Sequence, residues 1–290
     1  MKLSVIIPCY NAGETIAAQL EALASQEWSE PWEVIVSDNN STDDSMAIAE
    51  RYRQRLPNLR IVQAAEKQGG AYAINVGSRF AAGESIAFCD ADDVVAPGWL
   101  AAIGDALRIH DFVAPRFDMQ VLNPSWVQSR MWAAQGDGLL RTRFHPHLYH
   151  AGSCGLGVKR YVFEAVGGFD ESLPVLWDSD FCFKVQLAGT KLYFEPQAVV
   201  YVRQRGTLKG AFNQARQWAS YNVLMYRRYH APEQSFPNPW KLYLILWEQL
   251  LLKLLHIRRR EDWAKCVWAL GWQIGLLQGS FIFREPPLPM

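Results

Sequence analysis

Short apolar runs alternate with amphipathic segments through the first hundred residues of the chain. The run Leu3–Ile7 is continuous and rich in β-branched residues, which is typical of a buried strand. Similar but shorter runs lie at 34–36, 61–62 and 86–89. Between these runs, Ile16, Leu20 and Leu23 recur at helical spacing. A second helix, carrying Met46, Ala49 and Tyr52, and a third over Tyr72–Ala82 are also predicted. This alternation predicts an α/β fold with a mostly parallel central sheet and flanking helices.

The pattern is less regular after residue 110, where two glycine-rich turns and an acidic patch occur at 152–157, 167–168 and 170–180. Helices are predicted over 208–229 and 239–280. Within the second range, Leu242–Ile257 has twelve apolar residues in sixteen, interrupted by a narrow polar stripe. A helix that spans a membrane usually needs about 20 apolar residues. We therefore expect this segment not to span a membrane.

The net charge also changes sign along the chain, close to where the predicted C-terminal helices begin. The 29 basic and 29 acidic residues cancel overall, but residues 1–202 carry a net charge of −8 and residues 203–290 carry +8. The second part also holds six of the twelve Trp residues. We therefore expect an acidic domain over 1–202 and a basic, helical C-terminal region over 203–290 with a different role.

The five Cys residues are scattered and form no CxxC pair, which indicates reduced, mostly buried thiols rather than a disulfide framework or a zinc site. The first residues show no secretory signal pattern. We therefore expect a cytoplasmic protein.

Polar residues follow three of the predicted strands, where sheets of this kind bind their ligands. Asp90 and Asp92 follow the fourth strand and can flank one Mg²⁺ or Mn²⁺ ion, because these cations prefer oxygen ligands. The alternative is a polar turn in which Asp93 caps the next helix.

The ends of the first two strands offer groups that could bind a nucleoside. Tyr10 can stack on a base, and Asn11 and Asp38 can form hydrogen bonds to a base or a ribose. The alternative for Tyr10 and Asn11 is an ordinary turn. After Asp38, Ser41 and Thr42 are predicted to cap the helix that follows.

A further carboxylate, Asp178, lies at the entrance of an amphipathic stretch, Phe181–Leu187. Such a carboxylate can act as a general base for an acceptor hydroxyl. The alternative is helix capping and compensation of the helix dipole.

Taken in order, these segments resemble the family-2 glycosyltransferases of the GT-A fold. The resemblance covers roughly residues 1–202 and is carried by VIIPCYN, VSDNNSTDDS, FCDADD, GGFDES and WDSDFCFKVQLAG. It implies a nucleotide-sugar donor, a divalent cation and inversion at the anomeric carbon. It also implies a nucleoside pocket lined by Pro8, Tyr10, Asn11 and Asp38. By the same resemblance, Asp90 faces the ribose or the metal, Asp92 ligates the metal, and Asp178 is the catalytic base.

The chain departs from this family at three places. The segment Val199–Arg203 contains no His, whereas many relatives have a His metal ligand there, so fewer protein ligands are expected. Ile74 stands where relatives often have an Arg, and Lys67 or Arg79 could contact the diphosphate instead. Trp177 stands where relatives have Glu.

The sequence therefore predicts an inverting glycosyltransferase that acts on an acceptor hydroxyl, in cell-envelope or exopolysaccharide synthesis. The alternative is a non-catalytic sugar-nucleotide-binding or scaffold protein on the same fold. The acidic first part disfavours nucleic acid as a partner. The basic, Trp-rich second part favours peripheral contact with the cytoplasmic face of a membrane and a glycan or lipid-linked acceptor. The alternative is that these helices only pack on the catalytic domain.

Overall fold

The computed structural model describes residues 1–128, 135–233 and 238–287. The chain forms two compact units. The first comprises 1–121, 133–140 and 149–203, and the second comprises 122–132, 141–148 and 204–290. The second unit thus begins at Gln204 and also takes two short segments from the part of the chain that we had assigned to the first domain.

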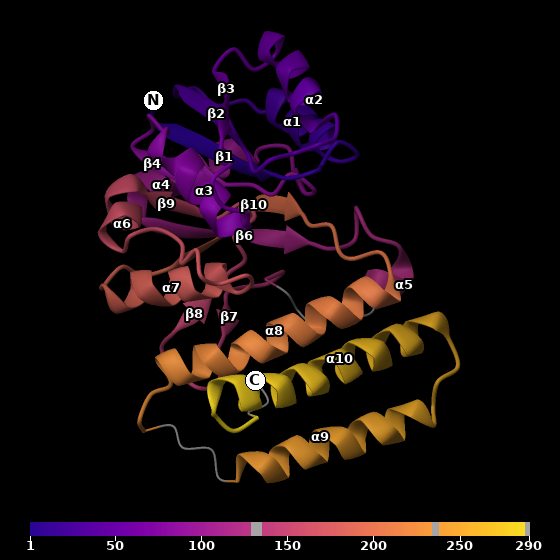
Figure 1. Cartoon of the computed structure of the whole chain (residues 1–290). Coiled ribbons are helices and arrows are strands. Elements are labelled where there is room, and N and C mark those ends of the chain that lie inside the picture. Colours follow the sequence, from indigo (N-terminus) through magenta and orange to yellow (C-terminus); the bar gives the residue numbers. More distant parts are fainter. Residues whose placement is uncertain (129–134, 234–237, 288–290) are drawn as a thin grey trace. The chain divides into compact units, whose positions relative to one another are not determined.

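An eight-stranded mixed sheet forms the centre of the first unit (Figure 1). Its strands are β1 (Leu3–Cys9), β2 (Trp32–Asp38), β3 (Leu59–Gln63), β4 (Ser85–Phe88), β5 (Val94–Val95), β6 (Phe112–Asp118), β9 (Gly157–Lys159) and β10 (Tyr193–Tyr201). Their order is β3-β2-β1-β4-β9-β6-β10-β5. Strands β1 to β4 pair in parallel, as do β6 and β10, whereas β9 and β5 are antiparallel to their neighbours. A separate two-stranded sheet contains β7 (Leu140–Arg141) and β8 (Tyr149–His150).

The sheet separates two hydrophobic cores. Successive side chains of a strand point to opposite faces, so Leu3, Val5 and Ile7 of β1 belong to one core and Ile6 belongs to the other. The helices of this unit are α1 (Ile16–Ala24), α2 (Ser45–Arg51), the 3₁₀ helix η1 (Tyr52–Gln54), α3 (Gly70–Arg79), α4 (Trp99–Ile109), α6 (Arg160–Ala165) and α7 (Trp177–Leu187). Figure 1 shows helices on both faces of the sheet, and the α/β architecture expected from the sequence is confirmed.

Helix α3 ends three residues before the predicted limit at Ala82. The chain must turn immediately into β4, and Gly83 passes against the backbone of β1. A Cβ atom on Gly83 would lie only 2.6 Å from the backbone nitrogen of Ser4. The close approach of two backbones therefore ends the helix early, and the apolar pattern alone gives no sign of it.

Three long helices dominate the second unit: α8 (Leu208–Tyr229), α9 (Pro239–Leu254) and α10 (Arg260–Phe283). The short helix α5 (Ser125–Gln128) also belongs to this unit. Small residues four apart bring α8 and α10 into backbone contact. The α8 residues are Ala211, Ala215 and Ala219, and the α10 residues are Gly271, Gly275 and Gly279. A Cβ atom on Gly275 would lie 2.2 Å from the carbonyl oxygen of Arg216, so only glycine allows this approach.

Helix α9 packs beside this pair through one narrow face. Tyr243 and Leu250 are buried, and the Tyr243 hydroxyl donates a hydrogen bond to the carbonyl oxygen of Gln273 over 3.1 Å. Within the described residues, α10 is the one helix whose length and apolar composition would suffice to cross a membrane. Helices in the core of soluble proteins can meet the same test.

Candidate functional site

The carboxyl ends of β1, β2 and β4 bring the predicted nucleoside and metal residues to one edge of the sheet. Cys9 of β1 is in register with Asp38 of β2, and Ile6 of β1 is in register with Phe88 of β4. The next residues along each strand therefore leave the sheet side by side. Pro8 lies half-buried in β1, whereas Tyr10 is just beyond it and is 52% exposed.

Asn11 and Asp38 shape the first part of this edge. Asn11 has a left-handed backbone (φ 47°), and its Oδ1 accepts a hydrogen bond from the backbone N–H of Thr42 over 2.8 Å. Its own backbone N–H donates to the hydroxyl of Ser41 over 3.1 Å. The buried Asp38 accepts the N–H of Ser41 over 2.9 Å. The β1 and β2 loops thus hold one another in place.

These bonds correct the expectation that Ser41 and Thr42 cap the next helix. Helix α2 begins at Ser45, and its N-cap residue is Asp44, which makes no side-chain capping bond. Ser41 and Thr42 bind Asn11 instead, about 30 residues earlier in the chain. A tertiary contact has therefore replaced the local interaction that residue types alone suggest.

Two carboxylates and a thiol gather after β4. Carboxylate oxygens of Asp90 and Asp93 and the Sγ atom of Cys154 all lie within 4.8 Å of one another. Burial, together with the charge of Asp92, raises the pKa of Asp93 to about 7. Burial and the nearby Asp93 raise the pKa of Cys154 well above its ordinary value, so this thiol stays protonated.

This concentration of negative charge fits a divalent cation. Oxygen ligands suit Mg²⁺ and Mn²⁺, whereas a neutral thiol does not. Asp93 already accepts the backbone N–H of Arg203 through Oδ1 over 2.7 Å and is almost completely buried. Asp90 and Asp92 are half-buried and remain the more accessible carboxylates.

The turn at 152–157 connects this cluster with Asp178. Ser153 donates a backbone hydrogen bond to Asp178, and the next residue is Cys154 of the acidic cluster. Sequence reasoning noted the glycine-rich turn but missed Cys154 as a neighbour of Asp90. Gly155, with a φ of 82° and a hydrogen bond to the Phe88 carbonyl oxygen, fixes the turn beside β4, and this long-range contact has no local signal in the sequence.

Asp178 occupies the first turn of α7 and does not cap it. The N-cap residue is Leu176, which has φ 59°. Burial raises the pKa of Asp178 to about 6, although hydrogen bonds from the N–H groups of Ser179 and Ser153 act in the opposite direction. The Ser179 N–H lies 2.7 Å from Asp178 Oδ1. This carboxylate is therefore ionised at neutral pH but is a stronger base than an ordinary aspartate.

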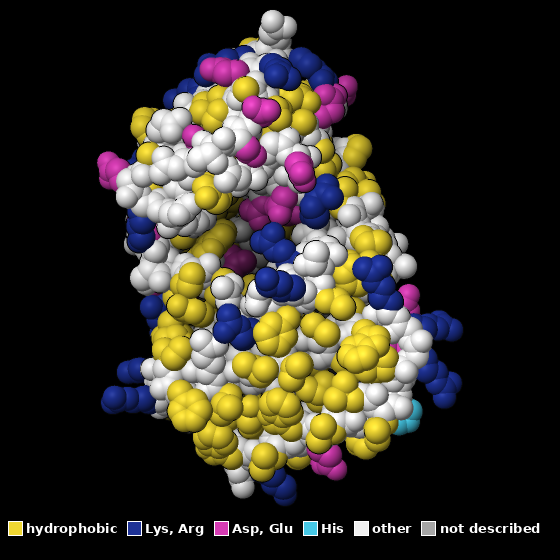
Figure 2. Space-filling model, turned by 45° about the vertical axis from the view of Figure 1, so that its right-hand side comes forward, with side chains coloured by type: hydrophobic (Ala, Val, Ile, Leu, Met, Phe, Trp, Pro, Cys, Tyr) yellow, Lys and Arg dark blue, Asp and Glu magenta, His cyan; other side chains and the backbone are white. Residues whose placement is uncertain are grey.

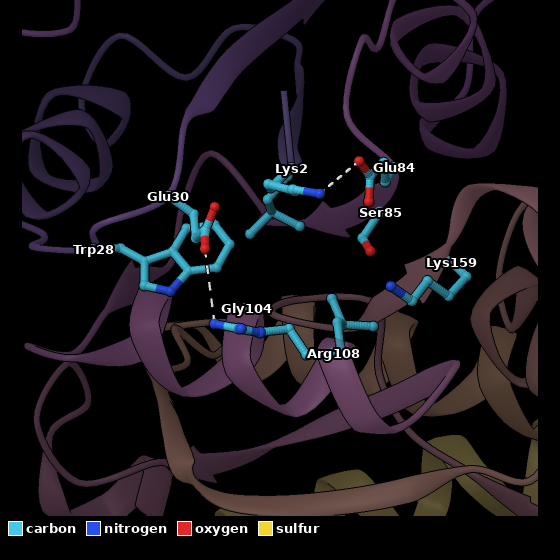
Figure 3. A pocket seen from close by; sticks show the side chains of 10 residues that line it. Lys2, Trp28, Glu30, Glu84, Ser85, Gly104, Arg108 and Lys159 are labelled. Atoms are coloured by element: carbon cyan, nitrogen blue, oxygen red, sulfur yellow. Dashed lines mark hydrogen bonds and ion pairs between the residues drawn. The ribbon is translucent and has the colours of Figure 1, made fainter.

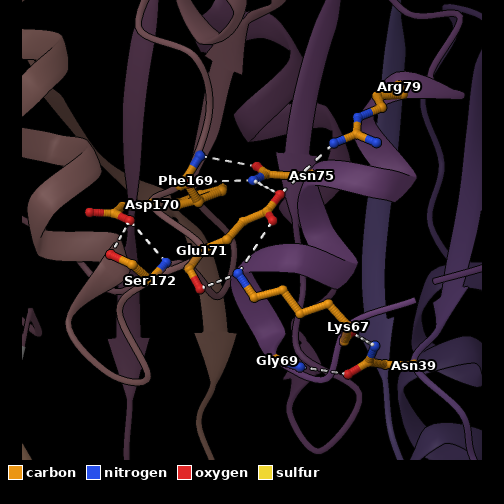
Figure 4. A network of polar contacts seen from close by, with 9 residues as sticks. All are labelled: Asn39, Lys67, Gly69, Asn75, Arg79, Phe169, Asp170, Glu171 and Ser172. Atoms are coloured by element: carbon orange, nitrogen blue, oxygen red, sulfur yellow. Dashed lines mark hydrogen bonds and ion pairs between the residues drawn. The ribbon is translucent and has the colours of Figure 1, made fainter. Parts of the chain in front are cut away.

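Lys67 and Arg79, the two candidates for replacing the Arg absent at position 74, both face Glu171 (Figure 4). The Lys67 ammonium donates to the Glu171 carbonyl oxygen over 2.8 Å, and the Arg79 guanidinium lies 3.9 Å from the Glu171 carboxylate. Asn75 Nδ2 donates to the same carboxylate and to the carbonyl oxygen of Phe169. Ile74 is fully buried in a core cluster.

Trp177 replaces the expected Glu with a packing contact. Its ring meets Phe169 edge-on at a centroid distance of 5.1 Å, and it also lies over Gly70, at the start of α3. A Cβ atom on Gly70 would be 3.5 Å from the indole. The side chain therefore supports the Phe169 loop.

Two cavities among the described residues of the first unit lie away from the acidic cluster. One of about 330 Å³ lies at the amino ends of β1 and β4, the opposite edge of the sheet, and is crossed by the Lys2–Glu84 ion pair of 2.7 Å (Figure 3). The other, of about 540 Å³, is bounded by Asn75, Arg79 and the loop 167–172. Arg79, one of the two candidate contacts for the diphosphate, lines the second cavity, whereas Pro8, Tyr10, Asn11, Asp38, Asp90, Asp92 and Asp178 line neither.

Comparisons with known proteins agree with the motif order. The profile of the family described as Glycosyl transferase family 2 matches residues 4–167. The uncharacterized glycosyltransferase YibD of Escherichia coli (strain K12) is 43% identical over 96 residues, which cover 33% of this chain and 27% of YibD. The poly(ribitol-phosphate) beta-N-acetylglucosaminyltransferase TarS of Staphylococcus aureus is 40% identical over 97 residues, 33% of this chain and 17% of TarS. The matched part is less than a third of either relative.

Two solved structures resemble the whole fold. TarS 1-349 of S. aureus in complex with UDP-GlcNAc has a TM-score of 0.59 at 19% identity, over 98% of this chain and 93% of that one. The mannosyltransferase PcManGT from Pyrobaculum calidifontis, in complex with GDP-Man and Mn²⁺, has a TM-score of 0.59 at 25% identity, over 93% and 73%.

Proposed function

Because this chain belongs to glycosyl transferase family 2, we propose that it transfers a sugar, with inversion, from a nucleoside-diphosphate sugar to an acceptor hydroxyl. The observation that carries the proposal is the turn at 152–157. Its Ser153 contacts Asp178 and its Cys154 contacts the acidic cluster of Asp90 and Asp93, which supports a single site. Direct displacement requires two parts: a general base for the acceptor hydroxyl and a site that stabilises the leaving diphosphate.

The donor's nucleoside is assigned to the edge formed by Pro8, Tyr10, Asn11 and Asp38. Tyr10 offers an exposed ring for stacking, and Asp38 offers a carboxylate for hydrogen bonds. The bonds that join Asn11 to Ser41 and Thr42 hold the two loops of this edge together. UDP-GlcNAc and GDP-Man in the two similar structures support a donor of this class.

Asp90 and Asp92 would hold a divalent cation. When bound, such a cation stabilises the negative charge of the leaving diphosphate. Asp93 is assigned a supporting role, because its carboxylate is buried and bound to the Arg203 backbone. Mn²⁺ in the mannosyltransferase structure supports this assignment.

Asp178 is the proposed general base. With its pKa near 6 it is ionised at neutral pH and accepts the proton of the acceptor hydroxyl as that oxygen attacks the anomeric carbon. The attack takes place opposite the leaving diphosphate, so the configuration at this carbon is inverted.

For the acceptor, we propose a lipid-linked or other membrane-bound glycan precursor at the cytoplasmic face of the membrane, in cell-envelope synthesis. Helix α9 and the residues after it carry a row of exposed apolar side chains: Trp240, Leu244, Ile245, Leu251, Leu252, Leu254 and Leu255. Figure 2 shows hydrophobic side chains spread broadly over the helical part of the chain. The basic residues Arg258, Arg259 and Arg260 follow this row and are exposed. Apolar and basic groups together fit an anionic lipid surface.

The test is nucleotide release from a panel of UDP- and GDP-sugars, with Mn²⁺ or Mg²⁺ and membrane lipid extracts as the source of acceptor. We expect release that depends on the cation and on the extract. Donor binding, seen as thermal stabilisation, without release under any condition would favour the alternative of a non-catalytic binding protein. Asp178→Asn is the matched control, because it should bind the donor without releasing nucleotide.

A further inference from the structure

Arg203 follows β10 and is bound to two consecutive residues of the acidic segment. Its backbone N–H donates to Asp93 Oδ1 over 2.7 Å, and its side-chain Nε–H donates to the carbonyl oxygen of Asp92 over 3.0 Å. The preceding residue, Val202, is buried, and its N–H donates to the carbonyl oxygen of Asp118 over 3.0 Å. Arg203 therefore has a fixed position beside the acidic cluster, 110 residues away from Asp93 in sequence.

Most of the guanidinium remains available for a ligand. A guanidinium has five N–H donors in a planar fork, and Arg203 uses the one on Nε to bind Asp92. The residue is exposed, and in the described part of the chain no carboxylate forms an ion pair with its side chain. The remaining N–H groups of this fork match the oxygens of a phosphate group.

The charges of the site favour a further cationic group beside the metal. A divalent ion on Asp90 and Asp92 only offsets these two carboxylates, and the diphosphate of a donor brings further negative charge. Lys67 and Arg79 are bound to Glu171. Arg203 is instead bound directly to the acidic segment. It cannot replace a His as a metal ligand, because a guanidinium is always protonated and has no free lone pair.

We propose that Arg203 binds the donor diphosphate directly, beside the cation held by Asp90 and Asp92, and thereby lets the protein retain part of its donor affinity without the cation. This inference rests on the proposed function. The bond to Asp92 holds the guanidinium beside the segment that carries the metal ligands. The cation and Arg203 can therefore contact the same diphosphate. A Lys at this position has no planar fork and could not bind the Asp92 carbonyl and two phosphate oxygens in the same way.

The experiment is calorimetric titration of UDP and GDP, and of uridine and guanosine, with Mn²⁺ and separately with EDTA. Arg203→Gln should weaken nucleoside-diphosphate binding on the order of 10-fold or more and leave nucleoside binding unchanged. The loss should be larger in EDTA, where the cation no longer shares the interaction. Arg203→Lys should recover only part of it. Arg108→Gln, which removes an exposed charge from the opposite edge of the sheet, is the control and should bind like wild type.

The outcomes separate the two claims. Arg203→Gln keeps the backbone bond to Asp93, and an unchanged thermal unfolding midpoint will establish that it is folded. If wild type binds UDP or GDP and Arg203→Gln binds it equally well, or loses nucleoside affinity to the same extent, the role of Arg203 is overturned and the proposed function stands. If wild type binds neither nucleotide in Mn²⁺, the proposed function fails and the role of Arg203 fails with it.

Discussion

The backbone N–H of Gly155 donates to the carbonyl oxygen of Phe88 over 2.5 Å. Phe88 ends β4, immediately before the segment that holds Asp90, and Gly155 lies between Cys154 and β9. This one bond fixes the turn that carries Ser153 and Cys154 against the strand that carries the acidic cluster. The distance between the proposed base and the proposed metal ligands therefore depends on the conformation of Gly155.

Gly155→Ala should destabilise the protein and reduce transfer. The residue has φ 82°, and an added Cβ would lie 2.5 Å from Val200 Cγ2 and 2.9 Å from Pro115 Cγ. A left-handed alanine costs about 1–2 kcal/mol, and the collision adds to this cost. Gly189→Ala is the matched control, because its φ is 96° but nothing lies within 4 Å of the added Cβ. Urea unfolding should show a clearly larger loss for Gly155→Ala, and equal losses would mean that the turn relaxes.

Gly275→Ala should disrupt the second unit despite the higher helix propensity of alanine. That propensity favours the variant by about 1 kcal/mol. The added Cβ, however, would lie 2.2 Å from the Arg216 carbonyl oxygen and 2.8 Å from Ala219 Cβ, and both belong to the facing helix. Helices α8 and α10 would have to move apart along their whole contact. We expect a lower thermal unfolding midpoint, whereas Leu270→Ala on the partly exposed side of α10 should change it little. A midpoint at or above wild type for Gly275→Ala would contradict the close packing.

Asp178→Asn should lower the transfer rate by about 10²–10⁴ while donor affinity stays near wild type. In wild type, the rate should rise with pH through about 6, because Asp178 must be ionised to act as the base. Its raised pKa moves the pH at which this carboxylate ionises upward from the ordinary value near 4. A profile that is flat between pH 5 and 8 would move the base to another residue. The readouts are initial rates of nucleotide release across this range and calorimetric donor binding at pH 7.5.

The same pKa predicts a stability effect with a definite sign. Asp178 has a pKa raised above its unfolded value of 3.8, so its neutral form is the one that the fold favours. Its contribution to stability is present at low pH and is lost as the pH rises through about 6. The unfolding free energy of Asp178→Asn should therefore rise relative to wild type between about pH 4 and about pH 6, and the gain should level off above about pH 7. Urea unfolding of both proteins at several pH values provides the comparison.

Site residues could be predicted from the sequence where local patterns position them, but not where contacts between segments far apart in the sequence do. The position of Tyr10, Asp38 and Asp90 at one edge of the sheet could be predicted from the sequence, because parallel apolar strands put their carboxyl ends at one edge and a local pattern reveals such strands. Cys154 was missed because its position depends on β9 returning antiparallel between β4 and β6, and no local signal encodes that pairing. The capping prediction at Ser41 and Thr42 was wrong for the same reason, since Asn11 competes for these residues from another loop.

Asp92→Asn should abolish transfer that depends on the cation and leave the fold intact. The side chain is half-buried, whereas the bond that connects this segment to Arg203 uses the Asp92 backbone carbonyl and would remain. Asp93→Asn should instead lower stability, because its buried carboxylate accepts the Arg203 N–H. Transfer rates at increasing Mn²⁺ and urea unfolding of both variants test this division. Near-normal cation-dependent turnover of Asp92→Asn would remove Asp92 from the metal site.

Binding to anionic vesicles should have two separable parts. Arg258, Arg259 and Arg260 are exposed, and each contributes about 1 kcal/mol near a negatively charged surface, an attraction that salt screens. Changing all three to Gln should therefore remove most of the salt-sensitive binding. Leu251 and Leu252, which are 59% and 53% exposed, should supply the part that persists at high salt. Leu251→Glu with Leu252→Glu should remove that part without disturbing the buried Tyr243 and Leu250, which hold α9 in place. Vesicle co-sedimentation at low and high salt measures both.

One outcome would overturn the membrane proposal without affecting the catalytic one. In that outcome, the wild-type protein does not bind anionic vesicles at low salt and sediments as a larger oligomer in their absence. The apolar row of α9 would then be an interface between copies of this chain.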